Sequence, residues 1–164
     1  MAKHNAIQKT NAMRMLDKAR TAYEAREYPH KPGEPVDGET VAALLGQDPA
    51  RVFKTLVTQG AGGGYFVFVV PVAATLDLKK AARAVGEKSV AMIPVARIEP
   101  VTGYVRGGCS PVGMKKAFPT VLDATAADGD TIMVSGGRIG LQIQLAPADL
   151  LAACGGKLAD LCAE

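Results

Sequence analysis

The stretch VFKTLV at residues 52–57 decides how the rest of this sequence is interpreted, because it is strand-like and yet carries a charge. Its β-branched and aromatic residues predict a strand over residues 51–58. Alternation places Lys54 on the same face as Val52 and Leu56. Because a buried ammonium needs a partner, a lysine here is paired, faces a ligand, or both. A lysine that protects an edge strand, or one that reaches to water, explains the strand alone equally well.

This strand is the first arm of a predicted hairpin. The glycine-rich residues 60–64 form the turn, and the apolar run YFVFVV at residues 65–70 returns as the partner strand. Periodicity predicts helices over residues 10–23, 40–45, 77–85 and 147–153, and strands over 23–28, 120–122, 131–134 and 141–145. Residues 90–98 are apolar but are interrupted by Pro94. Strands and helices intermingle without a regular alternation, so we predict one α+β domain over residues 1–164, built around a mixed, partly closed sheet.

Composition narrows the class of protein. The chain has 164 residues, 48% of them apolar, and a net charge of +3, which permits contact with nucleic acid without arguing for it. Its longest apolar run is only strand-length, and the N-terminus lacks the apolar segment of a signal peptide. Three widely spaced cysteines do not suggest a disulfide framework. We therefore expect a soluble, reduced, cytoplasmic protein that does not associate with membranes.

Two glycine-rich segments are candidates for chemistry. They are TGYVRGGCSP at residues 102–111 and SGGRIG at residues 135–140. Glycines let a backbone approach a ligand closely and turn its N–H groups toward it. The spacing fits neither a phosphate loop nor a dinucleotide fingerprint. Taken alone, each segment is more typical of a turn or a bulge than of a site.

Cys109 invites interpretation as a nucleophile, since it lies between Gly108 and Ser110. Only His4 and His30 are available as an imidazole base, and neither has a clear link to it. A cysteine nucleophile needs such a base or a lowered pKa, so a small buried thiol is the better interpretation. No Cys/His cluster has metal-ligand spacing, and no Ser/His/Asp order is convincing. We expect neither a metal nor a cofactor.

Several short motifs occur together in a characteristic order. They are FKTL at residues 53–56, LDLKKAA at 76–82, the glycine-rich segment and the two lysines that follow it at 102–116, and VSGG at 134–137 with Gly140-Leu141. The set resembles the YbaK/EbsC branch of the prolyl-tRNA editing proteins, which are relatives of the editing domain of bacterial prolyl-tRNA synthetase. The resemblance covers about residues 10–162. It implies an α+β domain with a curved, barrel-like sheet and flanking helices, and an enzyme that removes Cys from Cys-tRNA(Pro) and from Cys-tRNA(Cys), acting in trans.

The resemblance also implies which residues act. The family's essential lysine falls on Lys54. Substrate-binding positions fall on Tyr28, Thr55, Gly103, Gly107, Gly108, Ser110, Ser135, Gly136 and Gly137. The sequence departs from some relatives at Cys109, where they have an aliphatic residue, and at Arg138-Ile139, which replaces a basic pair.

This activity agrees with the shortage of catalytic groups. A cysteinyl ester needs no protein nucleophile if the substrate's own thiol attacks its carbonyl, so the enzyme only positions the thiol, excludes water and stabilises the oxyanion. The N–H groups of Gly136 and Gly137 are the expected oxyanion donors. Lys54 is expected to hold the terminal adenosine or to polarise the ester.

Two alternatives stay open. One is removal of Ala from Ala-tRNA(Pro) by an activated water, and the other is a non-catalytic module that binds tRNA or a synthetase. The expected partner is tRNA. Prolyl-tRNA synthetase is a candidate second partner, because the modest net charge predicts weak binding of tRNA by this domain alone.

Overall fold

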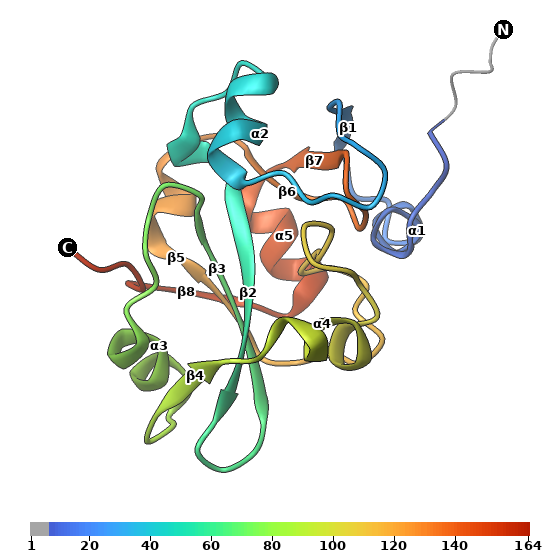
Figure 1. Cartoon of the computed structure of the whole chain (residues 1–164). Coiled ribbons are helices and arrows are strands. Elements are labelled where there is room, and N and C mark those ends of the chain that lie inside the picture. The colour runs from blue at the N-terminus through green and yellow to red at the C-terminus, as the bar shows by residue number, and fades with distance from the viewer. Residues whose placement is uncertain (1–6) are drawn as a thin grey trace, which may run out of the picture.

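The computed structural model describes residues 7–164, which form two β-sheets with helices packed against them (Figure 1). The strands are β1 (Glu24–Glu27), β2 (Phe53–Gly60), β3 (Tyr65–Pro71), β4 (Val90–Met92), β5 (Thr120–Asp123), β6 (Ile132–Ser135), β7 (Leu141–Leu145) and β8 (Lys157–Ala159). The helices are α1 (Asn11–Lys18), α2 (Gly38–Leu44), α3 (Leu78–Val85), α4 (Val95–Thr102) and α5 (Pro147–Cys154), with short 3-10 turns η2 (Pro49–Arg51) and η3 (Ala124–Asp128).

The predicted hairpin is confirmed and forms the middle of the larger sheet. Strand order is β4-β2-β3-β5-β8 in this sheet and β1-β7-β6 in the smaller one. β2 pairs antiparallel with β3, and Lys54 lies opposite Val70. β3 pairs in parallel with β5, and β5 with β8, so the sheet is mixed as predicted.

The continuous apolar run of β3 is explained by burial on both faces of the larger sheet. Val67 and Val69 face a core shared with α1, α5 and the smaller sheet. Phe68 and Val70 face a second core beneath α3. A strand covered on both sides has no solvent face, and so it shows no alternation between apolar and polar residues.

The two sheets meet where β2 begins. Val52 forms a parallel bridge with Met133 of β6. Ala42 of α2 packs over this bridge together with Val72. The junction closes one side of the fold and places the beginning of β2 beside the end of β6, which agrees with the predicted partial closure.

Two parts of the chain go beyond or differ from the predictions. Residues 90–98, for which no element was predicted, divide at Pro94 into β4 and the beginning of α4, a helix that has Pro94 as its N-cap and contains a second proline, Pro100. The helix predicted over residues 10–23 ends at Lys18, because Arg20 adopts a left-handed φ of 58°. Both differences arise from local backbone geometry, which apolar periodicity does not report.

A further strand, β8, was not predicted from periodicity. β8 covers the outer edge of β5, and the residues beyond it bridge back to the segment before α3, where Leu76 pairs with Cys162. The amide of Asp77 donates to the carbonyl of Leu161 at 2.8 Å. The last residues thus hold the base of α3 against the larger sheet. Within residues 7–164, no helix has the length and apolar composition needed to span a bilayer.

Candidate functional site

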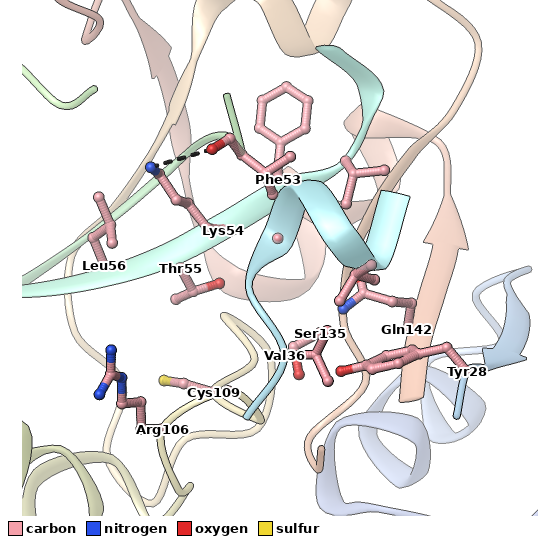
Figure 2. Close-up of a pocket in the computed structure, with 15 residues that line it drawn as sticks. Tyr28, Val36, Phe53, Lys54, Thr55, Leu56, Arg106, Cys109, Ser135 and Gln142 are labelled. Carbon is pink, nitrogen blue, oxygen red and sulfur yellow. Dashed lines mark hydrogen bonds between the residues drawn. The ribbon is translucent and has the colours of Figure 1, made fainter. Parts of the chain in front are cut away.

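A cavity of about 290 Å³ lies at the junction of the two sheets (Figure 2). Its walls come from the beginning of β2, from β6 and β7, from the segment that leads into α2, and from a turn over residues 106–109. The polar residues that line it are Tyr28, Lys54, Thr55, Arg106, Cys109, Ser135 and Gln142.

The structure brings together some of the predicted site residues and leaves others outside. Lys54, Thr55, Tyr28, Gly107 and Ser135 line the cavity, although they come from widely separated parts of the chain. The remaining predicted positions, Gly103, Gly108, Ser110, Gly136 and Gly137, are not among its lining residues.

Lys54 is half-buried at the cavity wall. Its Nζ donates a hydrogen bond to the carbonyl oxygen of Val72 at 3.4 Å (Figure 2). This bond is near the upper limit of hydrogen-bond length, and an ammonium carries three hydrogens, so the group retains donors for a ligand. The cavity lining contains no Asp or Glu and one other cation, Arg106. The cavity is therefore suited to a ligand that is anionic or that develops negative charge.

Two buried oxygens at the cavity have no hydrogen-bond partner within residues 7–164. They are Thr55 Oγ1 and Gln142 Oε1. Gln142 is 6% exposed and lies opposite Ser135 in the pairing of β6 with β7. An unpaired buried polar group costs about 1–3 kcal/mol, and native structures tolerate few of them outside functional sites. Their presence in one cavity favours this cavity as the functional site.

The predicted glycines act mainly by allowing close packing around the cavity. A Cβ on Gly107 would lie 2.6 Å from the Cβ of Pro35, and one on Gly108 would lie 2.7 Å from the Cα of Arg138. The turn over residues 105–108 can therefore contact two other loops directly. Gly103 follows α4 as its left-handed C-cap, with a φ of 85°.

The other two glycines and Ser110 are occupied within the protein. The amide of Gly136 donates to the carbonyl of Leu141 at 2.9 Å, and the amide of Gly137 donates to Ser135 Oγ at 3.2 Å. Ser110 is fully buried, and its Oγ accepts from the amide of Val112 at 3.2 Å. Gly136 and Gly137 can act as oxyanion donors only if these bonds are exchanged.

Cys109 forms part of the cavity wall as a neutral thiol. It is 9% exposed, and burial raises its pKa to about 11. Its Sγ–H points to Thr102 Oγ1 at 3.9 Å. His30 is exposed and is not among the lining residues, while His4 lies outside the described residues. The predicted small buried thiol agrees with this placement, and nothing in the cavity wall is positioned to deprotonate it.

Sequence reasoning missed Arg106 and Gln142. The strand predicted over residues 141–145 has the alternating sequence LQIQL, which places Gln142 and Gln144 on one face and does not mark either as a site residue. Gln142 is buried, because β7 lies between β1 and β6 and loops cover this face. Arg106 lies in the glycine-rich segment at residues 102–111, which was interpreted as a turn, so no role was predicted for its side chain.

Among the residues that the structure describes, no group of three or more His, Cys, Asp or Glu side chains is placed to hold a metal ion.

Comparison with known proteins gives consistent results. Residues 34–153 match the family model of the aminoacyl-tRNA editing domain. Over 161 residues the chain is 45% identical to the protein of Enterococcus faecalis named "Putative Cys-tRNA(Pro)/Cys-tRNA(Cys) deacylase EbsC", covering 98% of both chains.

Solved structures agree in fold. The crystal structure of "a putative trans-editing enzyme for prolyl tRNA synthetase" is similar, with a TM-score of 0.80 and 26% identity, over 96% of this chain and 100% of that one. A hypothetical protein with 22% identity has a TM-score of 0.83 over 94% of this chain and 100% of that one, which shows a common fold alone.

Proposed function

This chain belongs to the aminoacyl-tRNA editing domain family, and we propose that it is a deacylase that removes cysteine from Cys-tRNA(Pro) and Cys-tRNA(Cys). The observation that carries this proposal is the small cavity that contains Lys54 but no His, Asp or Glu to activate a protein nucleophile. The relative named as a Cys-tRNA deacylase supports the choice of substrate.

The size of the cavity limits what it can hold. Sites for drug-sized ligands occupy about 300–1,000 Å³. At about 290 Å³, this cavity fits an aminoacyl group with the adjoining ribose, and not several nucleotides. The ester bond is therefore the part of the substrate that enters it.

The chemistry follows from what the cavity lacks. The cysteinyl sulfur attacks its own ester carbonyl, so that a C–S bond forms and the C–O bond to the ribose breaks. The thiol proton passes to the leaving ribose oxygen, which restores the hydroxyl of the tRNA. Water then opens the resulting thiolactone to free cysteine. The protein's contribution is to hold the thiol against the carbonyl and to stabilise the oxyanion.

Lys54 is the residue that we propose to stabilise this reaction. Its Nζ makes one hydrogen bond, to the carbonyl oxygen of Val72, and retains further donors for a ligand. The hydroxyl groups of Tyr28, Thr55 and Ser135 line the same cavity and are candidates to orient the aminoacyl group. Cys109 is not proposed as a nucleophile, since its pKa of about 11 keeps it protonated at neutral pH.

We propose prolyl-tRNA synthetase as the partner that delivers the substrate, in the cytoplasm. A net charge of +3 provides little affinity for a polyanion, and tethering to a second tRNA-binding protein raises the effective concentration of substrate. Addition of the synthetase is therefore expected to increase the rate at low tRNA concentration.

The experiment that tests this function compares initial deacylation rates on tRNA(Pro) charged with Cys, Ser, Ala or Pro. We expect rapid cleavage of the Cys ester, little cleavage of the Ser ester and none of the Pro ester. Serine is nearly isosteric with cysteine, but its hydroxyl is a far weaker nucleophile at neutral pH.

Three contrary results would each change the proposed mechanism, substrate or function. Similar rates on Cys and Ser esters would rule out attack by the substrate thiol, because a pocket that activates water discriminates poorly between near-isosteres. Fastest cleavage of the Ala ester would reassign the substrate. Binding of tRNA without cleavage of any ester would reject the enzyme in favour of a binding module.

A further inference from the structure

Arg106 stands at the tip of a tight turn on the rim of the cavity. The amide of Gly108 donates to the carbonyl of Val105 at 2.9 Å, which closes a four-residue turn. Gly107 occupies the third position with a φ of 84°, as a type II turn requires. Arg106 is thus the second residue of the turn, and its exposed side chain lines the rim of the cavity.

The turn is held firmly from both sides. Gly107 packs against Pro35, and Gly108 packs against the backbone of Arg138, at distances that leave no room for a side chain. Cys109, which follows, is buried. The backbone position of Arg106 is therefore fixed although its side chain is exposed.

The guanidinium of Arg106 has no hydrogen-bond or ion-pair partner within residues 7–164. Arg51, by contrast, has a structural role. Arg51 donates to the carbonyls of Thr125, Ala126 and Thr131. An arginine that is well placed but unpartnered, in a cavity wall with Lys54 and without a carboxylate, indicates a site for an anion.

In Figure 2 the side chain of Arg106 extends from the turn toward the cavity. Lys54 and Leu56, which lie along β2, line the same cavity. We propose that Arg106 binds the phosphodiester on the 5′ side of the terminal adenosine, next to the ester that enters the cavity. This inference rests on the proposed function. The phosphate is the anion nearest to the ester in such a substrate, and a guanidinium matches two phosphate oxygens at once. The contact fixes the nucleoside at the rim while Lys54 acts deeper in the cavity.

The test uses two minimal substrates, the cysteinyl ester of adenosine and the cysteinyl ester of adenosine 5′-monophosphate. The wild-type protein is expected to prefer the phosphorylated ester in kcat/KM. The change Arg106→Gln should lower kcat/KM on that ester by about tenfold to a hundredfold, the range for a lost hydrogen bond to a charged group. It should leave the unphosphorylated ester unaffected. Arg106→Lys should fall between the two, because it keeps the charge and loses the bidentate geometry.

Arg83→Gln is the matched control. Arg83 is also exposed and without a hydrogen bond among the described residues, but it lies on α3 and does not line this cavity. Its removal should change neither rate. Inhibition by adenosine 5′-monophosphate and by inorganic phosphate separates a nucleotide site from a general anion site. The nucleotide is expected to inhibit the wild type more strongly than inorganic phosphate does, and Arg106→Gln should remove that advantage.

The outcomes are distinct. An equal loss on both esters in Arg106→Gln, or no loss on either, would overturn the phosphate contact. Equal inhibition by inorganic phosphate and the nucleotide would also overturn it. If the wild type cleaves Cys-tRNA(Pro) but ignores the 5′-phosphate, only this inference fails. If it cleaves no cysteinyl ester, the proposed function fails and this inference falls with it.

Discussion

Replacing Lys54 with Met is the sharpest test of the cavity, because it removes the charge and retains most of the aliphatic stem. The ammonium makes one long hydrogen bond, 3.4 Å to the carbonyl of Val72, from a half-buried position. Because the bond is long and only half-buried, we expect it to contribute about 1 kcal/mol to stability, near the value for an ordinary hydrogen bond. The backbone pairing of β2 with β3, in which Lys54 lies opposite Val70, does not depend on the side chain. The free energy of unfolding is therefore expected to change by less than about 1 kcal/mol.

Activity should respond much more strongly. Removing one donor that stabilises a developing oxyanion typically lowers kcat by about 10²–10³, or roughly 2.7–4 kcal/mol. The assay measures initial release of labelled cysteine from Cys-tRNA(Pro) beside thermal unfolding of the same preparation. Lys54→Arg is the companion variant, expected to be partly active because it keeps the charge with a different geometry. A folded Lys54→Met protein with nearly wild-type turnover would refute the role assigned to this lysine.

Three further predictions concern residues around the cavity and the core. Cys109→Ala should retain most activity, since the thiol stays protonated, and a loss of about 10³-fold, or 4 kcal/mol in the barrier, would identify it as a nucleophile instead. Gly108→Ala should destabilise the fold by about 1–3 kcal/mol and lower activity, because the new Cβ would lie 2.7 Å from the backbone of Arg138; an unchanged melting temperature would contradict this. Burial acts to raise the pKa of Asp123, but its hydrogen bonds, including one from the amide of Leu161 at 3.0 Å, outweigh burial and hold that pKa below its usual value of 3.8. Asp123 should thus contribute stability above about pH 4, and this stability should be lost as the pH falls through the lowered pKa of Asp123. In urea unfolding, Asp123→Asn should therefore be less stable than the wild type by about 1–3 kcal/mol at pH 7 and as stable as the wild type in acid.

The larger features of the fold could be predicted from the sequence because each rests on a local pattern. The hairpin of β2 and β3 combines two strand-like runs with a glycine turn, and α3 ends at Val85 as predicted, with Gly86 as its left-handed C-cap. β8 could not be predicted, since its three residues are half or fully exposed and their strand geometry comes from pairing with β5. α4 was obscured by Pro94 and Pro100, which favour irregular structure when considered singly.

For the site, the limit was tertiary packing. Lys54 could be identified because a charge in an apolar strand violates a local pattern. Gln142 and Arg106 violate none, since a glutamine in an alternating strand and an arginine in a turn are ordinary. Their positions in the cavity depend on how β7 and the turn over residues 105–108 come together with β2, which is a property of the assembled fold. The glycines were placed in the right region, but the structure shows most of them engaged in packing and backbone hydrogen bonds.

Residues 157–159 of β8 are synthesised after all the other strands of the larger sheet. β8 covers the outer edge of β5, and the amide of Ala163 donates to the carbonyl of Thr75 at 2.8 Å. While the ribosome is still adding these residues, the nascent chain carries an uncovered strand edge beside apolar side chains, which is a template for pairing with other chains. The cavity also forms late in synthesis, because Lys54 is synthesised long before Ser135 and Gln142, which line the same cavity. We therefore expect chains that stall or are truncated before residue 157 to aggregate.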